Sequence, residues 1–89
     1  MRRIRAKYSG GDLLVDGRKM PEGFTPIELL VAALAYGVGT KYADAGLGDY
    51  EVECSVEGDE VRCRGRCAGV EERCLVFKLL RGAVRFECA

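Results

Sequence analysis

Apolar and polar side chains alternate along the start of the chain, and this pattern predicts β-strands. In residues 2–8 the apolar side chains at positions 4, 6 and 8 alternate with basic ones, which is the period of a half-buried strand. A second strand is predicted over residues 13–15, ending at Asp16-Gly17, a dipeptide that tolerates positive φ angles in a tight turn. A short third strand is predicted over residues 18–20.

Two later segments, residues 50–57 and 60–67, predict a hairpin closed by Gly58-Asp59. Glycine at the first loop position suits a type II′ turn, and a two-residue loop determines which residues lie opposite one another. One face of the hairpin is then apolar. The other sets acidic residues opposite basic ones, as in a solvated ladder of ion pairs rather than a ligand site. The expected pairs include Cys54–Cys63, Glu53–Arg64, Glu51–Arg66 and Tyr50–Cys67.

A long buried helix is predicted after Thr25. Threonine as N-cap, proline at the first helical position and Glu28 three residues after the cap form the signature of a capping box. Residues 27–36 are apolar on every side, so we expect this helix to be buried all round. Glycines at positions 37 and 39 are expected to weaken or end it, with a brief restart over residues 41–44 as the alternative.

The last part of the chain predicts a second helix and a closing strand. Residues 69–80 carry apolar side chains near one face and two glutamates in the first turn, where the helix dipole favours negative charge. Residues 83–88 alternate again between apolar and charged side chains. With 89 residues and no change of composition, the chain is expected to form one α+β domain over residues 1–89.

Charge and hydropathy narrow the classes of partner. Fourteen lysines and arginines against fourteen aspartates and glutamates give a formal net charge of zero, so the chain lacks the positive charge of a nucleic-acid binder. The longest apolar segment, residues 29–36, is far shorter than the roughly 20 residues that span a bilayer. The basic N-terminus is not followed by the apolar run of a secretion signal. We therefore expect a cytoplasmic protein with neither nucleic acid nor a membrane as its partner.

The five cysteines are many for a cytoplasmic chain, and their odd number leaves at least one unpaired in a monomer. Cys54 and Cys63 face each other in the predicted hairpin, where we expect buried thiols, with a disulfide as the alternative. The cysteine spacing lacks the Cys-x2-Cys pairs of zinc sites and the chain has no histidine, so no metal or other cofactor is expected. The pairing of the remaining cysteines is left open.

Cys74 is the candidate reactive thiol. It lies near the start of the second predicted helix and follows Arg73, and both features favour the thiolate form of a cysteine. The competing interpretation is a core cysteine on the apolar face of that helix.

Two segments resemble the OsmC/Ohr (organic hydroperoxide resistance) family. Residues 23–35 are similar to its central helix motif, a Pro-x-Glu-Leu-Leu-x-x-Ala-Leu run, and residues 71–84 are similar to its second cysteine region. Leu75 stands where the family usually has proline, and the stretch between the two motifs is shorter than in the family. The resemblance implies an OsmC-like fold, with antiparallel sheets, a central buried helix and a second shorter helix, built as an intertwined homodimer.

The resemblance also implies a chemistry that this chain lacks in part. In the family, a peroxidatic cysteine at the end of the first helix reduces peroxide and is then resolved by the second-helix cysteine, which corresponds to Cys74. The peroxidatic position falls on Gly37, which has no sulfur. Glu28 corresponds to the glutamate that holds an arginine beside the reactive thiolate, although a capping box explains Glu28 without that role. The candidates for this arginine are Arg2, Arg3, Arg5 and Arg18.

Three functions remain open from the sequence. The first is a truncated OsmC/Ohr-like homodimer without the standard two-cysteine peroxidase reaction, acting as a structural module or binding a small apolar ligand or hydroperoxide between its subunits. The alternative is a thiol-dependent hydroperoxide reductase that uses Cys74, with Cys63 or Cys67 as resolving partner. The third is a metal-stabilised interaction domain.

Overall fold

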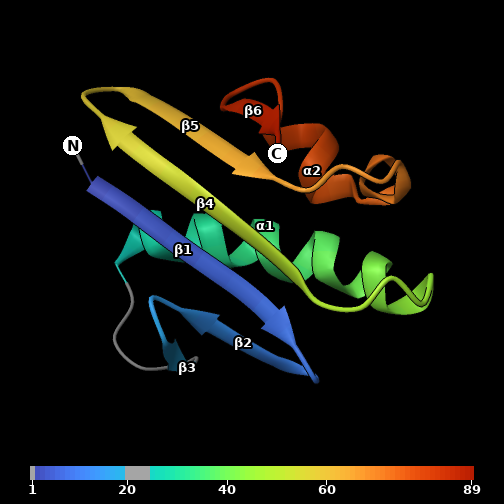
Figure 1. The fold of residues 1–89 in the computed structure, drawn as a ribbon. Helices are drawn as coiled ribbons and strands as arrows, with labels where there is room; N and C mark the ends of the chain where they lie inside the picture. Colours follow the sequence, from blue (N-terminus) through green and yellow to red (C-terminus); the bar gives the residue numbers. More distant parts are fainter. Residues whose placement is uncertain (1, 20–24) are drawn as a thin grey trace.

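The computed structural model describes residues 2–19 and 25–89. It has two layers, a six-stranded sheet and a pair of helices on one face of it (Figure 1). Met20 of the predicted third strand and residues 23–24 of the helix motif lie outside the described residues. The elements are β1 (Arg2–Ser9), β2 (Asp12–Val15), β3 (Arg18–Lys19), α1 (Pro26–Asp44), β4 (Tyr50–Glu57), β5 (Glu60–Gly65), the 3₁₀ helix η1 (Val70–Arg73), α2 (Leu75–Leu80) and β6 (Arg85–Cys88).

The sheet combines antiparallel and parallel pairs. Its order is β3-β2-β1-β4-β5-β6, and every pair is antiparallel except β5 and β6. The last pair is parallel because η1 and α2 carry the chain back before β6 begins, which is the crossover that parallel strands need. The α+β class is confirmed, whereas the expected antiparallel sheets are one mixed sheet.

Local turn chemistry closes the hairpins as predicted. Asp16 and Gly17 have φ angles of 50° and 81°, the positive values that a type I′ turn needs. Gly58 has a φ of 59° and Asp59 has no positive φ, as in a type II′ turn. The resulting register between β4 and β5 places Cys54 opposite Cys63, which confirms that part of the prediction.

The predicted ladder is wrong beyond Gly65, where β5 ends. Arg66 leaves the sheet and donates hydrogen bonds to the carbonyls of Leu47 (3.0 Å) and Asp49 (3.1 Å). Its guanidinium lies 4.5 Å from the ring centroid of Tyr42. These contacts replace the expected Glu51–Arg66 pair, because backbone carbonyls and an aromatic face satisfy the cation at the end of the strand.

Helix α1 runs unbroken through both glycines, contrary to expectation. A Cβ atom at Gly39 would lie 2.5 Å from the Cβ of Tyr8, and one at Gly37 would lie 2.7 Å from the Sγ of Cys74. Glycine at these positions therefore permits close approach of β1 and of Cys74. The packed face offsets the helix-propensity cost of about 1 kcal/mol per glycine.

The prediction that this helix is buried all round is also wrong. One face of α1 packs against the sheet, while Leu29 and Tyr36 are exposed, with the ring of Tyr36 stacked beside Tyr8 of β1. The core between the helix and the sheet contains Ile4, Val15, Val31, Leu34, Val38, Tyr42, Tyr50 and Val52, all fully buried.

The second predicted helix is divided at Cys74. This residue has an extended backbone, with φ −90° and ψ 118°, between the end of η1 and the start of α2. Its N–H donates to the carbonyl of Glu71 (3.0 Å), and its carbonyl accepts from the N–H of Lys78 (3.1 Å). Cys74 is thus buried at the junction of two helical turns rather than on the face of one continuous helix.

Candidate functional site

Cys74 lies against the middle of α1, next to Gly37. A Cβ atom built at Gly37 would meet the Sγ of Cys74 at 2.7 Å, and the next nearest atoms, both of Val76, at 3.4 and 3.7 Å. The Cys74 side chain is only 3% exposed. The two positions that the sequence singles out for thiol chemistry are therefore in contact, and only Cys74 supplies a sulfur atom there.

Glu28 is the other predicted site residue, and it is held by two sets of contacts. Its carboxylate accepts hydrogen bonds from the backbone N–H (2.8 Å) and the hydroxyl (2.9 Å) of Thr25, while its own N–H donates to that hydroxyl, so the capping box is confirmed. It also forms a partly buried ion pair with Arg18. Of the candidate arginines, Arg18 is therefore a partner of Glu28; the side chain of Arg2 lies outside the described part of the chain.

Glu28 and Cys74 are not brought together within the chain. Gly37, which marks the position of Cys74 along α1, lies nine residues after Glu28. With a rise of 1.5 Å per residue this is a separation of roughly 13 Å along the helix axis. The ion pair between Glu28 and Arg18 therefore stabilises the start of α1 and does not contact the thiol of the same chain.

Two buried polar side chains lie near Cys74. Tyr50 is 1% exposed, and its hydroxyl has no hydrogen-bond partner among the described residues. Burial raises the pKa of Tyr50, and the neighbouring Tyr42, Glu71 and Cys74 raise it further, so the phenol stays neutral.

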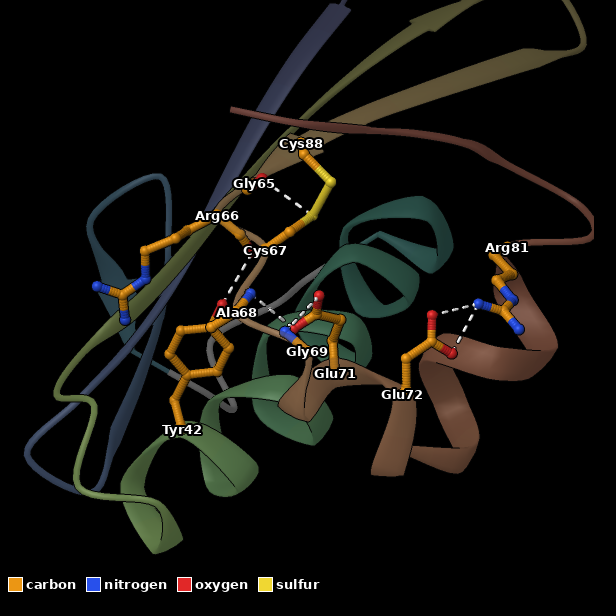
Figure 2. Close-up of a disulfide and its surroundings, with 10 residues drawn as sticks. All are labelled: Tyr42, Gly65, Arg66, Cys67, Ala68, Gly69, Glu71, Glu72, Arg81 and Cys88. Atoms are coloured by element: carbon orange, nitrogen blue, oxygen red, sulfur yellow. Dashed lines mark hydrogen bonds and ion pairs between the residues drawn. A yellow bond between two sulfur atoms is a disulfide. The ribbon is translucent and has the colours of Figure 1, made fainter.

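Glu71 is the second of these buried side chains, and it keeps its charge. Burial alone raises the pKa of its carboxyl group, but hydrogen bonds from its own N–H and from those of Ala68 and Gly69, each of the latter 3.1 Å, outweigh burial and lower the pKa below its usual range. Figure 2 shows the carboxylate folded back onto these two N–H groups. Glu71 thus caps the turn that leads into η1, just before Cys74.

The other four cysteines form two disulfides. Cys54 is bonded to Cys63 across β4 and β5, and Cys67 is bonded to Cys88 at the end of β6. The expectation of buried thiols at the first pair is therefore wrong and the alternative is confirmed, because the facing pair brings the two Cα atoms to 4.0 Å. Both suggested resolving partners of Cys74 are bonded elsewhere, and Cys74 is the free thiol.

The same disulfides bear on the metal hypothesis. A cysteine in a disulfide has no thiolate to offer a metal ion. Within residues 2–19 and 25–89, no three cysteine, aspartate or glutamate side chains are grouped closely enough to hold one. None of the helices described is both long and apolar enough to cross a membrane.

Sequence reasoning missed the Cys67–Cys88 bond. The predicted hairpin places residue 67 opposite Tyr50, and nothing local shows that the last strand returns parallel to β5, with Cys88 paired to Gly65. The one available signal is that both cysteines flank a segment of helical periodicity. That signal does not indicate whether the strand that follows the helix runs parallel or antiparallel to β5.

Comparison of the chain with protein-family models, with curated proteins and with solved structures gives no match.

Proposed function

We propose that this chain is an OsmC/Ohr-like homodimeric protein without the two-cysteine peroxidase reaction, which binds a small apolar ligand between its subunits. The observation that carries the proposal is the contact between Gly37 and Cys74. The resemblance implies that a peroxidatic cysteine at the first position would meet a resolving cysteine at the second. The spacing found between the two positions supports that relation, and glycine at the first removes the nucleophile.

Because Gly37 has no sulfur, one chain cannot complete the two-cysteine peroxidase reaction. In the two-cysteine reaction a thiolate attacks the peroxide oxygen and becomes a sulfenic acid while an alcohol leaves. A second thiol then forms a disulfide with it and releases water. Cys74 is the free thiol, since the other four cysteines are bonded in pairs. One thiol cannot supply both steps.

The surface supports a dimer that forms through the helical layer. Leu75 and Leu79 of α2 are 68% and 67% exposed, and Leu29 and Tyr36 of α1 are exposed as well. The opposite face of the sheet carries ion pairs such as Arg5–Glu53 (3.0 Å), so it is the charged side of the molecule. A domain of this size buries a smaller fraction of its surface than a larger domain does, and a second copy covering the helical layer adds to the core.

Oligomeric state tests the dimer directly. Light scattering after size exclusion should give twice the chain mass for the wild type, and a Leu75→Glu/Leu79→Glu variant should run as a monomer. Leu47→Glu is the matched control, because Leu47 is also exposed but lies in the loop before β4. A monomeric wild type, or equal dissociation by both changes, would contradict the proposed interface.

The peroxidase part is tested with a stoichiometric amount of cumene hydroperoxide and no added thiol, so that both disulfides stay closed. The wild type should not reduce the peroxide. Gly37→Cys should consume one equivalent and form a disulfide between the new cysteine and Cys74, whereas Gly37→Ser, which adds a similar volume without sulfur, should not. If the wild type consumes peroxide and Cys74→Ser abolishes this, the alternative of a hydroperoxide reductase based on Cys74 replaces the proposal.

Apolar binding is tested by mass spectrometry of the native protein. The wild-type dimer should retain a fatty acid or a similar apolar probe, and the monomeric Leu75→Glu/Leu79→Glu variant should lose it. Equal retention by both would place the ligand outside the interface and refute that part of the proposal.

A further inference from the structure

The two disulfides differ in their access to solvent. Cys54 and Cys63 are 0% and 1% exposed between β4 and β5. Cys88 is exposed and Cys67 is half-buried, and their bond lies at the edge of the sheet, joining the loop after β5 to the last residue of β6 (Figure 2). A thiolate opens a disulfide by reaching one of its sulfur atoms, so access decides which bond reacts. The Cys67–Cys88 bond is the one that an external thiol reaches.

The same bond closes a segment that contains Cys74. Its two cysteines are 21 positions apart in the chain, and η1, α2 and most of β6 lie between them. As the edge strand, β6 is paired on one side only, through four residues of parallel ladder and a hydrogen bond from the N–H of Ala89 to the carbonyl of Gly65 (2.8 Å). Phe86 adds an edge-to-face contact with Phe77 of α2 at 5.0 Å.

We propose that Cys67–Cys88 is a thiol-exchange site, which a small external thiol opens reversibly, and that opening it loosens the segment that buries Cys74. An external thiolate attacks the sulfur of the exposed residue Cys88, the bond between the two sulfurs breaks, and Cys67 leaves as a thiolate that takes a proton from water. A second external thiol attacks the mixed disulfide and frees Cys88. The protein disulfide is reduced to two thiols, and the two external thiols are oxidised to one disulfide.

Opening the Cys67–Cys88 bond affects Cys74 because the remaining contacts of Cys74 are with its own segment and with α1. The hydrogen bonds of Cys74 are to Glu71 and Lys78 of the same segment, so they move with it. Its burial depends on how this segment packs against α1, where Gly37 allows the close approach. Without the covalent closure, local opening of the segment costs less free energy, and a buried thiol reacts through such openings. The proposal concerns a different bond from the peroxide chemistry and does not depend on it.

Partial reduction tests the first step. The folded protein is treated with a limiting amount of dithiothreitol, alkylated with iodoacetamide and digested with trypsin, which leaves each of the five cysteines on its own peptide. Cys67 and Cys88 should be labelled first, and Cys54 and Cys63 only after denaturation. Equal or earlier labelling of Cys54 and Cys63 would overturn the proposal.

The second step is tested by the rate at which Cys74 reacts with a chromogenic disulfide reagent. In a Cys67→Ser/Cys88→Ser variant this rate should rise by roughly ten-fold or more, because opening becomes more frequent. The matched Cys54→Ala/Cys63→Ala variant, in which Cys67–Cys88 stays closed, should keep the Cys74 rate as slow as in the wild type. Should either variant fail to fold, hydrogen exchange of the wild type answers the same question, since selective opening should accelerate exchange at the N–H groups of Cys74 and Lys78, which are hydrogen-bonded within this segment, as well as in residues 84–89. An unchanged Cys74 rate, or unchanged exchange, refutes the link.

Discussion

The contact between Gly37 and Cys74 makes a quantitative prediction about alanine at position 37. Glycine in a helix interior costs about 0.5–1 kcal/mol relative to alanine, so Gly37→Ala gains that amount in helix propensity. The added methyl group would lie 2.7 Å from the Sγ of Cys74 and must displace it. Overpacking of this kind costs about 1–3 kcal/mol. The net effect in the wild type should be a loss of about 0–2.5 kcal/mol of unfolding free energy.

Removing the sulfur should reverse the sign. In a Cys74→Ala background the nearest remaining atoms are those of Val76 at 3.4 and 3.7 Å, which is ordinary contact. Gly37→Ala should then stabilise by about 0.5–1 kcal/mol, so the coupling between the two positions is about 1–3 kcal/mol. Urea unfolding without reductant, followed by circular dichroism for the four members of the cycle, measures it.

Gly39→Ala is the control for this cycle. A methyl group there meets the Cβ of Tyr8 at 2.5 Å, and that atom cannot move without its backbone. The variant should be destabilised equally with and without Cys74. If Gly37→Ala instead stabilises the protein by the same amount in both backgrounds, Gly37 and Cys74 are not in contact, and the arrangement described for the candidate site is wrong.

The remaining predictions concern buried polar groups. Glu28→Gln keeps the shape of the cap but removes the charge that faces the half-exposed Arg18, and should cost about 1–2 kcal/mol in urea unfolding at neutral pH. Tyr50→Phe removes a buried hydroxyl without a partner among the described residues and should leave stability unchanged or raise it by up to about 1 kcal/mol. Tyr42→Phe, which deletes a 2.9 Å hydrogen bond to the carbonyl of Arg66, should instead cost about 1 kcal/mol. Because the folded pKa of Tyr50 is raised, its contribution to the unfolding free energy is complete below the ordinary tyrosine pKa of about 10 and is lost at higher pH. The unfolding free energy of Tyr50→Phe should therefore decrease less above about pH 10 than that of the wild type. The folded pKa of Glu71 is lowered, so its contribution to the unfolding free energy is present above the ordinary glutamate pKa of about 4.3 and is lost as the pH falls below that value. Glu71→Gln should therefore be less stable than the wild type at pH 7, and its unfolding free energy should fall less between about pH 5 and 3. An unchanged acid dependence would contradict the role given to the backbone hydrogen bonds of Glu71.

Local features of this protein are determined by the sequence alone. The two-residue turn at Gly58-Asp59 predicts that Cys54 and Cys63 face each other, because a turn type restricts the register of the strands beside it. The start of α1 is predictable for the same reason, since Thr25 and Glu28 satisfy the first N–H groups of the helix within one turn. These are interactions between residues near in sequence, and residue type alone specifies them.

Features that join distant parts of the chain are decided only by the tertiary structure. Glycine at positions 37 and 39 suggests a helix end. In the structure, glycine is needed at these positions because Cys74 and Tyr8 approach the helix closely there, and that approach exists only once the layers pack. Arg18 is one of four candidates until β3 lies beside the start of α1. The Cys67–Cys88 bond depends on β6 joining β5 in parallel, and the alternation of residues 83–88 specifies a strand without specifying its direction or neighbour. Hydrophobic periodicity reports which side of an element is buried, whereas the identity of what covers it depends on the packing of the whole chain.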